Sequence, residues 1–569
     1  MKNIIIVLLL CSVLTSCGED SFEPFVAINL VGYNLDDPKT AFLVNARSDS
    51  FEIVNASSEE VYSGKIADPL PVDSLSGDQV SIINFSDFRQ KGEFVIQTMG
   101  PEKIKSQPFS IGQNLYKDVA LTTIQSYYYA RCGTAIDNGN PWKHPVCHLD
   151  DAVFWGNPDR YKKVTGGWHD AGDYNKFSIN TALSAGLLLY IYEINSQVFI
   201  DNQFNIPEAD NGTPDLLDEV RWALEWLMKM QNNEGGVFHK VSQKHWVGEF
   251  LPQNDPEVRY IFKVTTNSTA GFTAVAALGA QLFAPFDTVF ADQLAKAAFR
   301  GWQYLQEHPD IQPSGGFENP PGVVGGEYAD DHDKDVRLWA AIELYKLTQD
   351  EKYLQYFTRT LADYQIDNLP PLSWKNFEVL ALSAFLNADL PREYQEQQQQ
   401  IYDLLNGQAK RLLKLHQANN YRHLLKENEF YWGSNSVNLA YAFVLIQLYE
   451  QNGNQEYYRV ALDQLHYTLG RNPMDISYVT GIGNSSVQNP YHQFSEKLGV
   501  EKPVPGMLVG GPNNHLDLRG HDISDYPAKS YEDRFKNYLV NEPAINYTAI
   551  FAYVAGYFAS PQKEFFTKQ

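Results

Sequence analysis

Cysteine and clustered positive charge are both scarce in this chain. Its 569 residues include four cysteines, of which Cys11 and Cys17 belong to an N-terminal apolar segment. Cys132 and Cys147 remain, enough for one disulfide or for half of a metal site. The formal net charge is −24, and no block of Lys and Arg occurs. Since phosphate binding requires clustered basic side chains, nucleic acid is excluded as a partner, and an uncharged polymer fits better.

Long apolar runs are also missing beyond the N-terminus, because no other stretch approaches the ~20 residues of a membrane-spanning helix. Residues 1–17 read MKNIIIVLLLCSVLTSC, in which a lysine precedes a short apolar run, as in a secretory signal. The end of this run resembles a bacterial lipobox, in which cleavage leaves Cys17 as a lipidated N-terminus. The acidic residues that follow resemble a surface-export tag. We therefore expect an exported protein, lipid-anchored at the outer membrane on the cell surface; the alternative is a soluble secreted protein.

The length allows a large core plus a smaller satellite domain. Residues 25–112 alternate short β-type segments, at 40–44, 50–54, 80–85 and 92–97, with clusters of Gly, Pro, Asp and Ser. This pattern predicts a small antiparallel β-sandwich. It contains no concentration of catalytic residue types, so we expect it to brace the next domain.

From about residue 114 the apolar pattern has a helical period, and we expect about twelve helices. Residues 214–230 are an example, with one apolar stripe, Thr213 as a cap and Pro214 in the first turn. Other strong helical segments are residues 334–348, 350–364, 434–449 and 456–469. No fixed-period repeat indicates a solenoid.

Residues 166–177, GGWHDAGDYNKF, are the main catalytic candidate. Asp170 and Asp173 lie three residues apart among glycines, which favours a shaped loop over a helix. Two carboxylates on one loop can face one cleft, where one orients a water molecule and the other takes its proton. The alternative is a solvated turn, in which Asp-Gly is common. Three neighbouring aromatic residues favour the catalytic interpretation, because surface turns contain few large apolar side chains.

Glu542, in the sequence YLVNEPAINYT of residues 538–548, is a second candidate. We expect it at the start of a helix, where Pro543 is acceptable in the first turn. The alternative, which position alone favours, is a glutamate that only complements the helix dipole.

Several motifs of the chain, taken in order, resemble glycoside hydrolase family 9, the cellulases and related β-1,4-glucanases. Besides the two acidic segments, they are GGEYADDHDKDVRLWAAIELYKL, YWGSN, LGRNPMDISYVTGIG and PGMLVGGPN. The resemblance covers nearly all of residues 114–560. It implies a mostly α protein, with an (α/α)6 barrel over residues 113–569. Residues 18–24 would be a linker, and residues 25–112 resemble the all-β immunoglobulin-like module that precedes some cellulase domains.

The resemblance also implies a role for each acid. The second Asp of the family's DAGD motif is the catalytic base, here Asp173, and the first, Asp170, helps to hold the attacking water. The acid is the Glu of the NE motif, here Glu542. The implied reaction is inverting hydrolysis, with the acid and the base roughly 6.5–9.5 Å apart. Glu542 must stay protonated near neutral pH, which burial or a second carboxylate would favour.

The chain departs from the family in one sugar-contacting segment. Members carry a His-His-Arg run, and the corresponding residues here are Tyr491, His492 and Gln493. Loss of the arginine removes a charged fork of donors, which affects subsite preference rather than fold or reaction class. Tyr491 and His492 are candidate substrate ligands, although His492 can instead be a structural histidine with a local partner.

Aromatic residues make up 13% of the chain, which suits sugar stacking but also suits large helical cores. Trp432 in the YWGSN segment is the best candidate sugar platform, and the others are Trp142, Trp246 and Trp374. On helical stripes, and therefore expected in the core, are Trp222, Trp226 and Trp339.

Cys132, Cys147, His148 and His169 form a usual ligand set for structural zinc, and some family members hold zinc with such a set. This site would fix the DAGD loop, because His169 precedes the first catalytic acid. The alternative is a Cys132–Cys147 disulfide, reasonable in an exported protein. Calcium is common in the family, and residues 208–218 and 330–335 supply acidic side chains, but no calcium ligands are assigned. We expect no organic cofactor.

The sequence as a whole predicts an inverting hydrolase that cleaves internal β-1,4-glucosidic bonds of cellulose, mixed-linkage glucan or xyloglucan. We expect a monomer that contacts the membrane only through its lipid anchor. One alternative is an exo-acting β-glucosidase or glucosaminidase on the same fold. The other is a non-catalytic surface protein that binds glycans.

Overall fold

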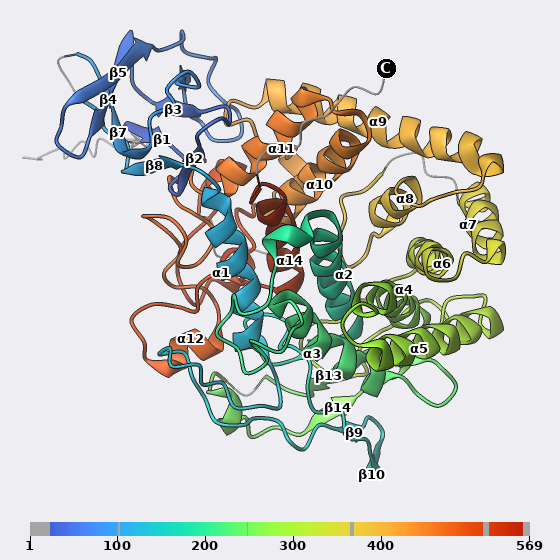
Figure 1. The fold of residues 1–569 in the computed structure, drawn as a ribbon. Helices are drawn as coiled ribbons and strands as arrows, with labels where there is room; N and C mark the ends of the chain where they lie inside the picture. Colours follow the sequence, from blue (N-terminus) through green and yellow to red (C-terminus); the bar gives the residue numbers. More distant parts are fainter. Residues whose placement is uncertain (1–22, 101–102, 247, 365–368, 516–522, 561–569) are drawn as a thin grey trace, which may run out of the picture.

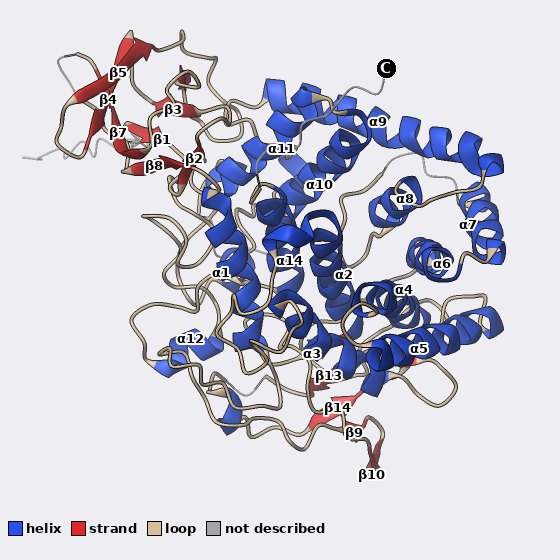
Figure 2. Cartoon of the chain, in the orientation of Figure 1, coloured by secondary structure: helices blue, strands red, loops and turns tan. Residues whose placement is uncertain are grey.

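The computed structural model describes residues 23–100, 103–246, 248–364, 369–515 and 523–560. A small β domain lies against one side of a large helical domain (Figures 1 and 2). Cys17 and the predicted signal segment lie outside the described residues, as does most of the predicted linker. Among the described helices, none combines the length and apolar composition needed to cross a membrane.

The β domain is a sandwich of two sheets. One sheet has the order β1 (Phe25–Ala27), β3 (Thr40–Val44), β6 (Val80–Asn84). The other has the order β2 (Gly32–Asn34), β8 (Phe109–Gly112), β7 (Gly92–Thr98), β4 (Ser50–Asn55), β5 (Glu60–Lys65). Pairing is antiparallel except between β2 and β8. The four segments expected as strands are β3, β4, β6 and β7, and alternate residues such as Ile53 and Ile96 fill the core.

The helical domain is a closed ring of inner helices surrounded by outer ones (Figure 1). The inner helices are α2 (Ser178–Asn195), α4 (Thr266–Phe283), α6 (Lys334–Thr348), α8 (Glu378–Leu386), α10 (Ser434–Asn452) and α14 (Ile545–Tyr557). The outer helices are α1 (Leu115–Ala130), α3 (Asp215–Met230), α5 (Thr288–Glu307), α7 (Glu351–Asp363), α9 (Gln395–Ala418) and α11 (Gln455–Thr468). Each inner helix contacts the next, and α14 closes the ring on α2.

Burial explains which helices form the inner ring. All nine residues of α8 are buried, whereas only three of the thirteen residues of α7 are. A helix that is apolar on every face must be enclosed, and one with a single apolar stripe belongs at the surface. The predicted cap of α3 was wrong: Pro214 occupies the N-cap position, with no side-chain cap.

Loops between the helices gather at one end of the ring and include two small sheets. One has the order β10 (Asn157–Tyr161), β9 (Val153–Phe154), β14 (Arg259–Ile261), β13 (Lys240–Gln243), β11 (Lys176–Phe177). The other pairs β12 (Val237–Phe238) with β15 (Val264–Thr265). Two short helices, α12 (Gln493–Leu498) and α13 (Tyr538–Asn541), also lie in these loops.

The sandwich is joined to the helical domain by polar contacts as well as apolar packing. The backbone N–H of Leu30 donates to the carbonyl of Leu469 at 2.9 Å. The buried Asp78 accepts from the Tyr421 hydroxyl at 2.7 Å and pairs with the Lys529 ammonium at 2.7 Å. Because a buried carboxylate is costly without such partners, these contacts fix how the two domains meet.

Candidate active site

The three predicted catalytic acids meet at one cavity. Asp170 and Asp173 lie in the loop that precedes β11 and α2, and Glu542 lies between α13 and α14. Their side chains line a cavity of about 380 Å³. Its aromatic walls consist of Phe177, Trp246, Tyr328, Trp432, Tyr491 and Tyr538. Neighbouring inner helices thus bring together acids separated by about 370 residues of sequence.

Close packing shapes the loop that carries the two aspartates. Gly167 has a φ of +76°, and a Cβ atom there would lie 2.6 Å from the Trp226 ring. A Cβ atom on Gly172 would lie 2.0 Å from the carbonyl oxygen of Tyr491. Only glycine fits at both positions, which is the physical reason for the glycines in this motif.

Buried ion pairs support the same loop from beneath. Asp151 pairs with the Lys176 ammonium at 2.7 Å and with the Arg259 guanidinium at 2.8 Å. Lys176 also donates to the carbonyl of Gly166, and Arg259 donates to the carbonyl of Tyr174. The loop backbone is therefore held from both ends, so its carboxylates have fixed directions.

Asp173 is oriented by one neighbour. Asn175 donates its backbone N–H to one carboxylate oxygen at 3.0 Å and its side-chain amide to the other at 2.6 Å. Burial raises the pKa of Asp173, while these two hydrogen bonds and the cations Arg259 and Lys240 oppose the rise. These donors favour the ionised form, which is the form a base requires.

Asp170 lies deeper and is oriented by other residues. Its carboxylate accepts from the Asn180 amide at 3.0 Å and from the Tyr328 hydroxyl at 2.9 Å. Burial raises the pKa of Asp170 to about 7, assisted by the charge of Asp173 and opposed by the hydrogen bonds. Its side chain is therefore a fixed hydrogen-bonding group beside Asp173.

Glu542 is not at a helix start, contrary to our expectation. It caps the C-terminal end of α13, and α14 begins only at Ile545, with Ala544 as its N-cap. Glu542 Oε1 accepts the backbone N–H of Gly172 at 3.2 Å. Burial, followed by the charge of Asp173, raises the pKa of Glu542 well above its usual range. A carboxyl beside two others in a desolvated site keeps its proton, as a general acid must.

The predicted substrate-binding residues do not all line the cavity. Tyr491 and Trp432 both line the cavity, and Trp432 is 41% exposed. His492 instead lies in a smaller space behind the loop, where its Nδ1 is 2.8 Å from the Ser495 hydroxyl. Gln493 is buried, and its backbone N–H donates to the carbonyl of Gly172. The structure thus gives His492 a local partner, the alternative left open by the sequence.

The other tryptophans divide in a similar way. Trp246 lines the cavity, and Trp374 packs edge-on against Tyr328 with 5.0 Å between ring centroids. Trp142 does not line it and donates to the carbonyl of Lys502. Trp226 and Trp339 are fully buried, as expected for core residues, whereas Trp222 is partly exposed.

Sequence reasoning missed four positioning groups, namely Asn175, Asn180, Tyr328 and Asn541. The first three bind the aspartates, and Asn541 donates to the carbonyl of Asn489, next to the Tyr491 segment. Amides and hydroxyls are common throughout the chain, so only their position identifies them. Asn175 could have been found, because an Asn two residues after an Asp in a turn can bond back to it.

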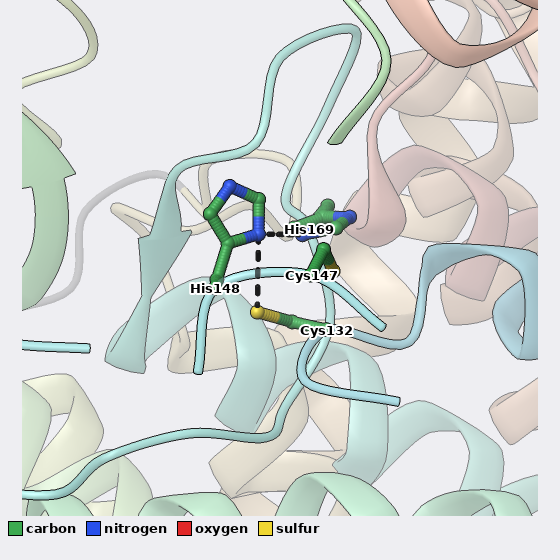
Figure 3. A group of neighbouring side chains, drawn as sticks. All are labelled: Cys132, Cys147, His148 and His169. Carbon is green, nitrogen blue, oxygen red and sulfur yellow. Dashed lines mark hydrogen bonds between the residues drawn. The ribbon is translucent and has the colours of Figure 1, made fainter. Parts of the chain in front are cut away.

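Cys132, Cys147, His148 and His169 converge beside the same loop (Figure 3). Their ligand atoms all lie within 4.8 Å of one another. Cys132 Sγ is 3.7 Å and His169 Nε2 is 3.3 Å from His148 Nδ1. Usual zinc bond lengths give tetrahedral edges of about 3.6 Å for S–N and about 3.3 Å for N–N, so the residues fit zinc.

The surroundings of this Cys/His cluster fit a metal site as well. Both cysteines are buried and are not joined in a disulfide. His148 turns Nδ1 toward the cluster and leaves Nε2 to Asp255, at 3.2 Å. A carboxylate on the outer nitrogen of a ligating histidine is the usual means of fixing its orientation.

The acid-rich segments give a mixed result for calcium. Asp215 accepts the backbone N–H groups of Asn202 and Gln203, so a loop already uses its charge. In the segment 330–335, His332 groups with Asp330 and Asp331, and also with Asp335 and Glu378. These contacts assign no calcium ligands, and calcium stays a prediction.

Comparison with known families decides the identity. The model described as "Glycosyl hydrolase family 9" matches residues 116–555, and "Cellulase N-terminal ig-like domain" matches residues 21–103. The chain belongs to glycosyl hydrolase family 9. As a family 9 protein it is a glycoside hydrolase, with the (α/α)6 fold and the N-terminal immunoglobulin-like domain expected from the sequence.

Individual relatives of this family 9 enzyme match over nearly its whole length. "Endoglucanase D" of Acetivibrio thermocellus is 31% identical and aligns over 95% of this chain and 85% of the relative. "Cellodextrinase" of Butyrivibrio fibrisolvens is 32% identical, over 91% and 97% respectively. The solved structure of a metagenome-derived glycoside hydrolase family 9 endoglucanase matches with a TM-score of 0.88. That match has 34% identity and covers 95% of this chain and 99% of that one.

Proposed function

We propose that this family 9 enzyme cleaves internal β-1,4-glucosidic bonds of a β-glucan with inversion. Glu542 is the acid, Asp173 is the base and Asp170 holds the attacking water. The observation that carries this proposal is the convergence of the three carboxyl groups on one aromatic-lined cavity, with different donors around each. The family and its endoglucanase relatives support the same reaction.

The reaction follows from which carboxyl group holds a proton. Glu542, with its raised pKa, gives its proton to the glycosidic oxygen as the bond from that oxygen to the anomeric carbon breaks. Asp173 removes a proton from a water molecule, whose oxygen bonds to the anomeric carbon from the opposite face. The products are two shorter glucans, one with an inverted anomeric centre. Glu542 leaves the cycle ionised and Asp173 protonated, and exchange with solvent resets both.

The walls of the cavity suit a neutral chain of sugar rings. Trp432 and Tyr538 lie with ring centroids 5.6 Å apart, and Tyr491 lies 5.6 Å from Tyr538. Exposed aromatic faces stack on the apolar faces of sugars while carboxylates bind the hydroxyls. Cellulose, mixed-linkage glucan and xyloglucan all present such rings.

An exo-acting enzyme on short substrates is the second candidate. Tyr491 motivates it, because an aromatic ring occupies a cavity position where the family usually has histidine, and one relative is named a cellodextrinase. Product lengths from a long cello-oligosaccharide distinguish the two. Early mixtures of intermediate lengths support endo action, and a single short product released from one end supports exo action.

A proton NMR time course with the three soluble glucans tests the main proposal. We expect α-anomeric reducing ends to appear first, and the preferred polymer to identify the substrate. Early β-anomers would contradict the acid and base assignments. No cleavage of any polymer or oligosaccharide by folded protein would favour a glycan-binding surface protein instead.

We also propose that the Cys/His cluster holds one structural zinc ion, bound by Cys132, Cys147, His148 and His169. When bound, the metal would supply a rigid cross-link next to Asp170 and no step of the hydrolysis. The donor set and spacing support this. Elemental analysis of purified protein should find about one zinc per chain; none would contradict the proposal.

Lipid attachment at Cys17 and display on the outer membrane are supported by the sequence of residues 1–17 alone. Membrane fractionation of the native protein and a Cys17→Ser variant tests them. We expect the native protein in the outer-membrane fraction and accessible to added protease on whole cells. Equal distribution of the two proteins would contradict the anchor.

A further inference from the structure

A continuous chain of hydrogen bonds joins the Cys/His cluster to Asp173 through Gln243. Gln243 is the last residue of β13, which pairs with β14 at the loop end of the helical ring (Figure 1). Its side chain bonds toward the cluster, and its backbone bonds toward the catalytic loop. The hydrolysis mechanism gives it no role.

The side chain of Gln243 is anchored on Asp255. Its Nε2 group donates to Asp255 Oδ2 at 2.5 Å. The same oxygen lies 3.2 Å from His148 Nε2, and the other oxygen of Asp255 accepts the backbone N–H of Glu257 at 3.0 Å. The side chain of Asp255 is only 1% exposed. A carboxylate that is buried this deeply and bonded on both oxygens is a fixed anchor.

The backbone of Gln243 orients the amide of Asn175. The Gln243 N–H donates to Asn175 Oδ1 at 3.2 Å. With its oxygen engaged there, the Asn175 amide presents its Nδ2 group to Asp173, at 2.6 Å. A rotated amide would place its oxygen against a carboxylate, which has no proton to give when ionised. The Gln243 N–H therefore selects the orientation in which Asn175 donates.

Strand pairing holds this end of β13 on one side only. Lys240 and Val241 pair with β11 as well as lying beside β14, whereas Gln243 pairs only with β14, opposite Arg259. Beyond it the chain leaves the sheet, and Trp246 is exposed. The bond to the buried anchor therefore helps to fix the position from which the Gln243 N–H reaches the catalytic loop.

We propose that Gln243 is a positioning residue for the base Asp173. It bridges Asp255 and Asn175, and thereby holds the Asn175 amide against the Asp173 carboxylate. This inference rests on the proposed function, in which Asp173 takes the proton from water. Asp255 then serves as one anchor for two groups, a histidine of the Cys/His cluster and the loop that carries the base.

The charges around the base are separate from this bridge. Ionisable side chains that interact with the charge of Asp173 include Asp170, Tyr174, Lys240, Arg259, Tyr491 and Glu542. A Gln243→Met substitution removes none of them. Its expected effect on the pKa of Asp173 is a rise, because a hydrogen bond to the ionised carboxylate is weakened.

Kinetics of Gln243→Met in the full-length enzyme, with a soluble β-glucan as substrate, test the proposal. Methionine has the length of glutamine but donates no hydrogen bond. We expect kcat to fall about threefold to thirtyfold and KM to stay within about a factor of two, because a misdirected base affects the transition state more than binding. The acidic limb of kcat/KM should move up by about half a pH unit or more. Gln303→Met, on the exposed face of α5, should change neither.

A double-mutant cycle distinguishes positioning from general destabilisation. Asn175→Leu removes the amide itself, so Gln243→Met in that background should lower kcat less than about twofold. Equal losses in both backgrounds would overturn the proposal, because Gln243 would then act without Asn175. Gln243→Lys keeps a donor that can reach Asp255, and it should retain kcat within about threefold. A loss as large as that of Gln243→Met would also overturn the proposal.

Two further measurements separate this inference from the other proposals. A fully active Asp173→Ala enzyme would overturn the role of Asp173 itself. A severely impaired Asp173→Ala enzyme, beside a Gln243→Met enzyme with native kcat and pH profile, would overturn only the role of Gln243. The zinc content of Gln243→Met should equal that of the native protein, because His148 keeps its bond to Asp255. Loss of zinc together with the rate would assign the effect to the cluster and overturn the proposal.

Discussion

Asp170 and Asp173 lie on the same loop as His169 of the Cys/His cluster, but the side chains of the two groups interact in different ways. His169 belongs to the cluster, and Asp170, the next residue, belongs to the cleft. The cleft assembles three carboxyl groups, Asp170, Asp173 and Glu542, whose ionised forms would repel one another in a desolvated space, which raises the pKa of Glu542. The four side chains of the Cys/His cluster can hydrogen-bond with one another or coordinate the proposed zinc ion. The comparison shows that one loop joins carboxyl groups that disfavour each other's ionisation to a set of donors whose ligand atoms lie within 4.8 Å of one another.

The largest effect is expected from substitution of Asp173, the proposed base. Asp173→Ala should lower kcat/KM about 10²- to 10⁴-fold, because it removes the carboxylate proposed to take the proton from the attacking water. Thermal stability should stay equal or rise, since one repelling charge is removed. Hydrolysis rates and melting curves of both proteins measure this, with Asp159→Ala on exposed β10 as the control. A large loss of stability would contradict the comparison, because the cleft would then be a stabilising region.

The next largest effect is expected from substitution of one cysteine of the Cys/His cluster. Cys147→Ser should lower Tm by roughly 5 °C or more, because loss of a metal ligand is among the most destabilising substitutions. Bound zinc should fall, and activity should decline through loss of order in the adjacent loop. Chelation of the native protein should reproduce the loss, whereas the variant should not respond to chelator. An unchanged Tm with unchanged activity would show that the cluster does not support the loop.

A smaller effect depends on pH. The pKa of Glu542 is raised in the folded protein above its ordinary value of 4.5. Below pH 4.5 both folded and unfolded chains hold the proton, so Glu542→Gln should change Tm little. Above pH 4.5 the unfolded chain loses this proton at a lower pH than the folded chain does. The native glutamate therefore lowers the free energy of unfolding as pH rises. The variant should therefore gain Tm over the native enzyme between pH 4.5 and neutral.

Two results qualify that pH prediction. A Tm difference that does not vary with pH would contradict the raised pKa. The activity of the native enzyme should also fall as pH increases through the pKa of Glu542, since the acid must be protonated. A rate that keeps increasing with pH would assign the acid elsewhere.

The smallest effect concerns the aromatic wall. Trp432→Ala should raise KM about threefold to tenfold while leaving kcat within a factor of a few, because stacking binds substrate and transition state alike. Tm should not change, since the ring is 41% exposed. Trp142, which is partly buried and packs against the core, offers the contrast: Trp142→Ala should affect Tm more than KM. An equal effect of both on KM would extend the binding surface beyond the cavity.

Some features could be predicted because their signals are local. The strands β3, β4, β6 and β7 were found from alternation within five to seven residues. The helix α6 was predicted to the residue from its apolar period. The prediction of helix boundaries was wrong where a contact with a distant segment determines the path of the backbone. Glu542 is expected at the start of a helix, but its carboxyl group accepts the Gly172 N–H instead.

Side-chain direction could not be predicted for the same reason. Tyr491 and His492 are adjacent, yet one lines the cleft and the other lies behind the loop beside Ser495. Their divergence follows from the start of α12, where His492 is the N-cap. No property of the two residue types distinguishes them.

The sequence by itself determined the helical ring, the family, the acids and the Cys/His set, because each depends on residue type and spacing along the chain. Only the tertiary structure showed that burial raises the pKa of Glu542 and which groups position the aspartates. It alone placed the Tyr328 hydroxyl on the Asp170 carboxylate. Protonation and polar contacts depend on burial and on distances between distant segments, and those exist only after the six helix pairs close.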